Sequence, residues 1–184
     1  MSYNPTLETK RLILRKISGD DKEDLFELLT NSEMDKKMIW NHLDDMDEIE
    51  AYITEVRDSY NMNHPSCFGI ELKEDNHLIG VVEFFNYKEE FNCVEMHYML
   101  LPKHHRKGMM TEALLKILSF IFDKTDINRI EAFCLKENKA AAKVLEKAGL
   151  ILEGILREKI LVGDEYMDIK LYSMLKSDMQ FVVV

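Results

Sequence analysis

Glu95 and His97 lie two residues apart in an apolar stretch, residues 94–101, that begins by alternating polar and apolar side chains. Successive side chains of a strand point to opposite faces, so these two would project from the same face. A carboxylate beside an imidazole could take a proton from a nucleophile, because histidine titrates near neutral pH. The alternative is a structural carboxylate that pairs with a cation, as in ordinary ion-pair networks.

A short basic loop follows this stretch. Pro102 ends the apolar run, and Lys-His-His-Arg-Lys at 103–107 precedes Gly108, where a helix is predicted to begin. The first turn of a helix has unpaired N–H groups and a partial positive charge, so it can bind an anion. The segment resembles a phosphate-binding loop, although it is neither a Walker A loop nor a dinucleotide fingerprint. The alternative is an ordinary strand–loop–helix junction with solvated cations.

The elements that would position these residues follow from hydrophobic periodicity. Strands are predicted at residues 11–15, 67–73, 78–86, 92–100, 129–135, 151–161 and 166–175. Helices are predicted from near Asp20, from Asp47 with Glu50 as a capping box, at 108–123, and at 138–147 with Gly149 as the terminating residue. The last two strands would form a hairpin through Gly163. This order is typical of an α+β or mixed α/β fold, and we expect residues 1–184 to form a single domain.

Composition narrows the possible partners. The formal net charge is −10, which disfavours binding to nucleic acid and favours a cationic partner, or simply keeps the protein soluble. Apolar runs are too short for a membrane span. Three scattered cysteines without a CxxC pair indicate reduced thiols and a cytoplasmic location. The spacing of His97, His104, His105 and Glu95 matches no standard zinc pattern, so no metal is expected.

Residues 94–113, ending in KGMMTEA, resemble the acyl-CoA pyrophosphate loop of the GNAT acetyltransferase superfamily. KGMMTEA is similar to the ribosomal-protein N-terminal acetyltransferase branch, the RimJ/RimL-like proteins. Residues 138–158 resemble the family's strand–helix–strand block, and residues 8–15 and 168–175 also match in kind. The resemblance implies a mixed sheet of about seven strands, splayed between the fourth and the fifth to admit acyl-CoA, with about four flanking helices.

The resemblance also implies roles for particular residues, with acetyl-CoA as the co-substrate. Its contacts would be Met99, Leu100, Leu101, His105, Arg106, Lys107, Gly108, Met109, Met110, Thr111 and Asn138. Asn138 would hold the pantetheine arm, and it could equally cap the following helix. Glu95 matches a glutamate that relatives carry on this strand and would act as the base through a water, with His97 as relay or replacement. A main-chain N–H near Leu100 would polarise the thioester.

Three positions depart from the family pattern. His105 stands where Gln or Arg is usual, Met110 where Gly or Ala is usual, and Ala141 where a hydroxyl residue often assists the leaving thiolate. Met110 could still offer its N–H if its side chain points away. Candidates for the missing acid are Tyr98, Tyr166, Tyr172 and Cys134. Alternatively, no dedicated acid exists.

The acceptor is predicted to be a primary amine, most simply a protein N-terminus. A small amine such as a polyamine or an aminoglycoside remains open, as does a non-catalytic acyl-CoA-binding module. Trp40, with its neighbours Ile39 and His42, and Tyr98 are the candidate acceptor-side residues. The sequence leaves open whether the protein is a monomer or a homodimer.

Overall fold

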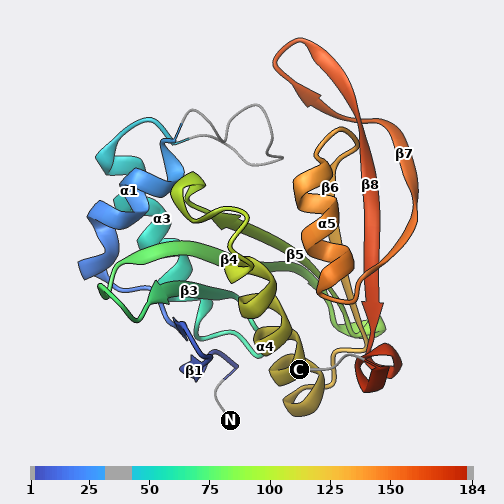
Figure 1. Ribbon diagram of the computed structural model, residues 1–184, viewed down its shortest axis with the longest axis horizontal. Helices are drawn as coiled ribbons and strands as arrows, with labels where there is room; N and C mark the ends of the chain where they lie inside the picture. Colours follow the sequence, from blue (N-terminus) through green and yellow to red (C-terminus); the bar gives the residue numbers. More distant parts are fainter. Residues whose placement is uncertain (1–2, 32–42, 182–184) are drawn as a thin grey trace.

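A computed structural model describes residues 3–31 and 43–181 of the chain, and it contains one mixed sheet (Figure 1). Its eight strands are β1 (Leu7–Glu8), β2 (Leu12–Arg15), β3 (Cys67–Leu72), β4 (Leu78–Lys88), β5 (Cys93–Leu100), β6 (Arg129–Leu135), β7 (Ile151–Val162) and β8 (Glu165–Leu175). The spatial order is β1-β2-β3-β4-β5-β6-β8-β7. Among the strands of the described residues, only the β5–β6 pair is parallel. The predicted mixed sheet is confirmed, and the additional strand is β1, which is too short to show an alternating pattern.

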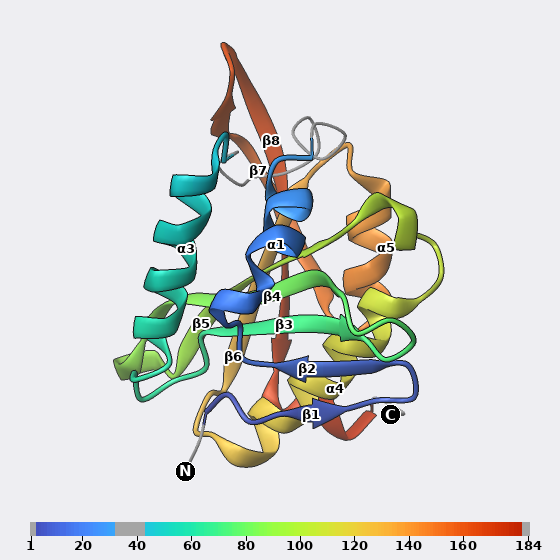
Figure 2. The ribbon, with the colours of Figure 1, turned by 90° about the vertical axis from the view of Figure 1, so that its left-hand side faces the viewer.

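Four α-helices cover the sheet in the described part of the chain (Figure 2). They are α1 (Lys22–Leu29), α3 (Met46–Ser59), α4 (Met109–Lys124) and α5 (Lys139–Lys147). Short 3-10 turns are η1 (Gly19–Asp21), η2 (Glu89–Phe91), η3 (Pro102–His104) and η4 (Lys176–Phe181). Helices α1 and α3 lie on one face of the sheet, and α4 and α5 lie on the other.

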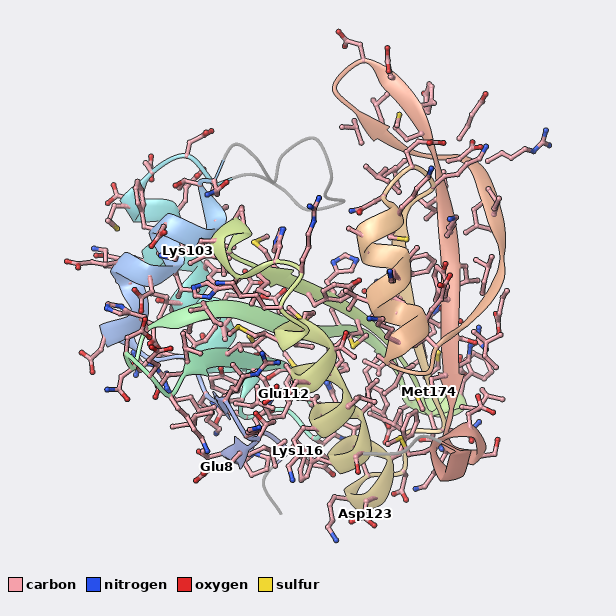
Figure 3. All side chains as sticks on the ribbon, viewed as in Figure 1. Glu8, Lys103, Glu112, Lys116, Asp123 and Met174 are labelled. Atoms are coloured by element: carbon pink, nitrogen blue, oxygen red, sulfur yellow. The ribbon has the colours of Figure 1, made fainter. Side chains whose placement is uncertain are left out.

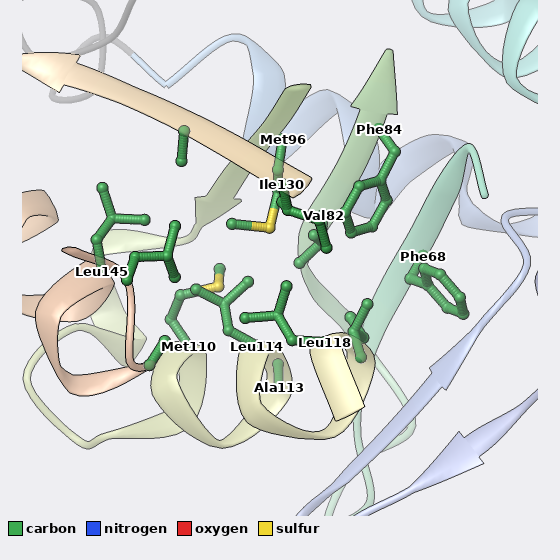
Figure 4. Packing of buried hydrophobic residues seen from close by; sticks show 14 of the residues in the cluster. Phe68, Val82, Phe84, Met96, Met110, Ala113, Leu114, Leu118, Ile130 and Leu145 are labelled. Atoms are coloured by element: carbon green, nitrogen blue, oxygen red, sulfur yellow. The ribbon is translucent and has the colours of Figure 1, made fainter. Parts of the chain in front are cut away.

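Each face of the sheet has its own hydrophobic core, as strand alternation requires. On the α4 side, Phe68, Val82 and Met96 pack against α4 residues that include Leu114 and Leu118 (Figure 4). On the other side, α1 and α3 bury a smaller cluster. Because β5 contributes to both cores through alternate residues, its position is fixed from both faces.

The predicted ends of α5 and of the hairpin are confirmed. Gly149 follows α5 in a left-handed conformation, and the N–H of Leu150 reaches back to the Leu145 carbonyl at 3.0 Å. This is a Schellman ending, for which glycine is the favoured residue. Gly163 has φ of 61° in the turn between β7 and β8.

The predicted start of α3 was wrong. The helix begins at Met46, and the N-cap is Asp45, whose carboxylate accepts hydrogen bonds from the N–H groups of Asp47 and Glu48. Glu50, expected to complete a capping box, instead forms an ion pair with Lys22 of α1. Asp45 precedes Asp47 in the chain, and its carboxylate accepts the hydrogen bonds of the first free N–H groups of the helix.

Arg15 joins the end of β2 to the turn before α1. Its guanidinium contacts both carboxylate oxygens of Asp21, at 2.9 and 2.7 Å, and Glu71 at 2.5 Å. Burial opposes ionisation of Asp21, but hydrogen bonds from Arg15 and Ser18 outweigh it and hold the pKa of Asp21 below its usual value. This carboxylate therefore stabilises the fold above its unfolded pKa, and the stabilisation is lost as the pH falls through the folded pKa.

We expect Asp21→Asn to lower the free energy of unfolding by about 2 kcal/mol at pH 7. This is less than the cost of removing one partner of a fully buried ion pair, because Arg15 keeps its ion pair with Glu71. The difference between wild type and variant should shrink as the pH falls below about 4, because the unfolded wild type then takes up a proton on Asp21 before the folded protein does. Urea unfolding at pH 7 and at pH 3 measures both. An equal deficit at the two pH values would contradict a charge-dependent role.

Candidate active site

The site is built around an opening between β5 and β6. Residues 93–96 of β5 pair with residues 129–132 of β6, and beyond Met96 the two strands have no further paired residues. Strand β6 continues with β8 as its partner, and α5 follows it (Figure 1). The predicted splay between the fourth and fifth strands of the sequence analysis is thus confirmed, since these are β5 and β6 in the structure.

The register of β4 and β5 shows which main-chain groups line this opening. The N–H of Leu101 donates to the Ile79 carbonyl of β4 at 2.9 Å. Main-chain groups of successive strand residues point to opposite edges, so those of Leu100 and Tyr98 point away from β4. They face the side from which β6 has separated. Of the predicted Met99, Leu100 and Leu101, it is Leu100 that directs its N–H into the opening.

The loop after β5 is folded tightly against the strand end. The His105 N–H donates to the Pro102 carbonyl at 3.0 Å, and its ring Nε2 donates to the Leu100 carbonyl at 2.7 Å. Arg106 and Gly108 both have positive φ, of 60° and 75°. The two left-handed residues turn the chain from the strand end into the start of α4, and they leave Arg106 and Lys107 exposed.

Helix α4 begins without a side-chain cap. Its N-cap is Gly108, and within the part of the chain that the structure describes no side chain accepts from the first-turn N–H groups of Met109, Met110 and Thr111. These groups are the donors that an anion would take. The side chains of Met109 and Met110 are buried in the core, so Met110 does not obstruct its own N–H. The unusual methionine is therefore compatible with an anion at this helix start.

Three residues that sequence reasoning missed hold the loop in place. Glu112, which is labelled on α4 in Figure 3, accepts from the Thr9 hydroxyl at 2.6 Å and from the Arg11 Nε at 2.7 Å. Arg11 Nη1 in turn donates to the Lys107 carbonyl at 2.9 Å. This Thr9–Arg11–Glu112 cluster fixes both the loop and the first turn of α4. The only signal in the sequence was that both segments belong to resembling blocks.

Asn138 is the N-cap of α5 and accepts from the Ala141 N–H through its Oδ1, at 3.0 Å. This is the capping role that the sequence allowed, and contact with pantetheine stays a prediction. The Tyr98 hydroxyl crosses from β5 and donates to the Ala141 carbonyl at 3.0 Å. Tyr98 packs with the α4 and α5 core, so its side chain lies on the face opposite to Glu95 and His97.

On the α1 and α3 face, the predicted pair stands where the opening begins. Glu95 is in register with Glu131 of β6, and His97 is the next residue on this face, beyond the paired segment. The His97 ring lies against Phe85, with ring centroids 4.4 Å apart. Burial lowers the pKa of His97 to about 4, so its imidazole is neutral at pH 7.

A second carboxylate, Glu83 of β4, escaped the sequence analysis. It is directly opposite His97 in the β4–β5 register, and it accepts a hydrogen bond from the Tyr52 hydroxyl of α3. Burial raises the pKa of Glu83 to about 7, against the lowering effect of the Tyr52 hydrogen bond. A lone glutamate inside the apolar run LIGVVEFF was the signal that could have identified it.

The other candidates for a proton donor have different surroundings. Tyr166 is 68% exposed on the hairpin, and the Tyr172 hydroxyl donates to Glu146 at 3.0 Å. Burial raises the pKa of Cys134 to about 11. Trp40, Ile39 and His42 lie outside the described residues.

Three further properties bear on partners. Within residues 3–31 and 43–181, no three His, Cys, Asp or Glu side chains are grouped closely enough to hold a metal ion. No helix in the described part of the chain has the length and apolar character needed to cross a membrane. Cys67, Cys93 and Cys134 are free thiols.

The sheet is splayed beside an open strand edge and an uncapped helix start, which is the arrangement that the sequence resemblance implies for an acyltransferase. The model of the Acetyltransferase (GNAT) domain family matches residues 11–151, and the chain belongs to this family. It is 31% identical over 175 residues to the uncharacterized N-acetyltransferase YoaA of Bacillus subtilis, covering 94% of this chain and 97% of that one. It is 30% identical over 101 residues to the ribosomal-protein-serine acetyltransferase of Escherichia coli, covering 55% and 56%.

Among solved structures, the fold is similar to that of spermidine N-acetyltransferase from Vibrio cholerae, which was determined with CoA and spermine. The TM-score is 0.81 at 23% identity, over 94% of this chain and 99% of that one. At this identity, the likeness concerns the fold. The chain is thus an N-acetyltransferase of the GNAT family whose relatives include ribosomal-protein acetyltransferases.

Proposed function

We propose that this enzyme transfers the acetyl group of acetyl-CoA to a primary amine, most simply a protein N-terminal amine, by direct attack in a ternary complex. The observation that carries the proposal is the Leu101–Ile79 hydrogen bond, because strand alternation then turns the Leu100 N–H toward the opening, next to the uncapped start of α4. The Leu100 N–H could polarise a thioester carbonyl, while the N–H groups at the start of α4 hold a pyrophosphate. A single elongated acyl-CoA would contact both.

The contacts proposed for acyl-CoA are distributed along its length. The pyrophosphate would accept from the N–H groups at the start of α4, with Arg106 and Lys107 adding attraction. The pantetheine would follow the free edge of β5 toward Asn138. The thioester oxygen would accept from the Leu100 N–H, which is held in place before the reaction begins and so needs no reorganisation.

The acceptor would approach on the face that carries Glu95 and His97. Helix α3, on that side, has five acidic residues and one basic residue in its sequence MDEIEAYITEVRDS. With the net charge of −10, this supports a cationic acceptor, which describes a basic N-terminus and a polyamine equally well. The ribosomal-protein relative supports the first, and the spermidine-acetylating fold relative is the reason to test the second.

An acceptor screen tests the proposal. Purified protein would be given acetyl-CoA with peptides bearing free N-termini, with polyamines and with aminoglycosides, and release of CoA would be followed. We expect release with at least one peptide N-terminus, and the matched N-blocked peptide is the control. Acetyl-CoA binding without release in the presence of any amine would instead indicate a non-catalytic binding module.

The leaving thiolate is proposed to take its proton from solvent. The Tyr98 hydroxyl already donates to Ala141, and burial raises the pKa of Tyr98. A thiol has a pKa of about 8.5 and a phenol about 10, so a tyrosine whose pKa is raised further gives up its proton poorly to a thiolate. Ala141 itself has no side-chain donor.

We therefore expect Tyr98→Phe to change kcat by no more than about threefold, whereas loss of a general acid costs about 10²–10⁴-fold. The stability should fall by about 1 kcal/mol, because one hydrogen bond to α5 is lost. Steady-state kinetics and thermal unfolding of the same preparations would measure both. A hundredfold fall in kcat, partly recovered by adding Ala141→Ser, would establish Tyr98 as the acid after all.

A further inference from the structure

Glu83 of β4 is a second carboxylate beside the reaction face, in addition to Glu95 of β5. Glu83 lies between β3 and β5, with Cys67 opposite it on one side and His97 on the other. Tyr52 of α3 covers it and donates to its Oε1. On the same face of the sheet Val81 and Met99 are buried, whereas Glu83 and His97 are partly exposed. The carboxylate therefore stands at the margin of the α3 contact.

We propose that Glu83 is the final acceptor of the proton that the attacking amine loses, and that His97 carries this proton between them. The inference rests on the proposed acetyl transfer and names a positioning and proton-accepting residue for the same site. Directly opposed residues of an antiparallel pair have Cβ atoms about 5 Å apart, within reach of a glutamate and an imidazole. His97 is also the first residue of its face beyond the β5–β6 pairing.

The two groups suit different parts of this task. A neutral imidazole can accept a proton on one ring nitrogen and release one from the other, but burial lowers the pKa of His97 to about 4, so it would not keep a proton at pH 7. Burial raises the pKa of Glu83 to about 7, which suits a group that takes up a proton and returns it to water near neutral pH. Glu95, beside Glu131, is the competing acceptor.

The transfer balances without another reactant. The amine nitrogen forms its bond to the thioester carbon, and the carbon–sulfur bond breaks with its electron pair going to sulfur. One proton of the nitrogen passes to His97, whose other ring nitrogen releases a proton to the Glu83 carboxylate. The thiolate takes a proton from solvent, and Glu83 returns one to solvent, so the products are the amide and CoA.

Four titratable groups face Glu83 from the elements packed against it, and two of them affect its titration. Tyr52 donates to it and favours the charged form, whereas the charge of Glu55 on the same helix disfavours it. Cys67 faces it from β3, and burial raises the pKa of this thiol, so Cys67 stays neutral. His97 faces it from β5 and is neutral as well. Tyr52 and Glu55 are therefore the two groups whose removal should move the titration, in opposite directions.

The test is the pH dependence of kcat at saturating acetyl-CoA, between pH 5.5 and 9, with an acceptor found in the screen. Wild type should show a limb near pH 7 that disappears in Glu83→Gln, with a fall in kcat of about 10²-fold or more. Tyr52→Phe should move the limb to higher pH, and Glu55→Gln should move it to lower pH. A role in packing alone would produce neither shift. His97→Phe, which keeps the ring contact with Phe85, should lower kcat as Glu83→Gln does.

Acetyl-CoA affinity and the melting temperature of each variant show whether the site is intact. A limb that persists in Glu83→Gln, or that is lost in Glu95→Gln instead, would overturn the assignment while leaving acetyl transfer in place. Wild-type activity in His97→Phe would overturn the relay. Failure of the wild type to release CoA with any amine would overturn the proposed function, and the role of Glu83 with it.

Discussion

Gly108→Glu should abolish acetyl-CoA binding, with a dissociation constant at least about 100-fold higher than that of the wild type, since like charges brought together cost several kcal/mol. Gly108 is the N-cap of α4, and a Cβ added there would lie 3.7 Å from Arg11 Nη2, beside the free N–H groups. A carboxylate would occupy the position proposed for the pyrophosphate. Calorimetry with acetyl-CoA measures the loss directly.

Two control variants separate charge from backbone strain. Gly108→Ala keeps the strain of a side chain at φ of 75°, about 1–2 kcal/mol of stability, but adds no charge. Gly163→Glu adds the same side chain at φ of 61° in the β7–β8 turn, where a Cβ meets nothing within 4 Å. Both should bind acetyl-CoA within a few-fold of wild type. Binding by Gly108→Glu at wild-type strength would show that the anion site lies elsewhere.

The parts of the fold that could be predicted from the sequence are those set by local patterns. Alternation identified β5, and helical spacing identified the buried face of α4. Gly149 and Gly163 marked their turns because their backbone conformations favour glycine. Local patterns were insufficient for β1, a two-residue strand, and for the choice of Asp45 over Asp47 at the start of α3. Several acidic residues near the start of a helix can each serve as its N-cap. The suitable residue that lies nearest to the first turn takes this role.

The candidate site was predictable to the same extent. The loop at 103–108 and the β5 edge form one continuous segment, so their order along the chain indicated a site. Glu83 and the Thr9–Arg11–Glu112 cluster were missed because they depend on contacts between residues far apart in sequence, as Arg11 and Glu112 are. Register mattered too, since Leu101 and Leu100 differ by one residue but direct their N–H groups to opposite edges.

A second large effect on acetyl-CoA binding is expected when the Thr9–Arg11–Glu112 cluster is broken. The cluster lies outside the groups that would bind acetyl-CoA. Arg11 is 38% exposed and Glu112 20% exposed, so their ion pair alone is worth little. The two side chains also make contacts with the main chain. Glu112 accepts from the Arg11 N–H at 3.0 Å, and the Arg11 guanidinium donates to the Lys107 carbonyl. Loss of these contacts would free the loop that presents the α4 N–H groups.

Arg11→Gln should therefore raise the KM for acetyl-CoA about tenfold, the equivalent of one charged hydrogen bond, and leave kcat at saturation close to that of the wild type. The KM for the amine should not change, because the acceptor approaches on the other side of β5. Glu8→Gln is the matched control, since it breaks the neighbouring surface pair with Lys73 without touching the loop. Steady-state kinetics with each substrate varied in turn measures the split. A fall in kcat without a change in KM would show that Arg11 supports the reaction centre rather than the pyrophosphate loop.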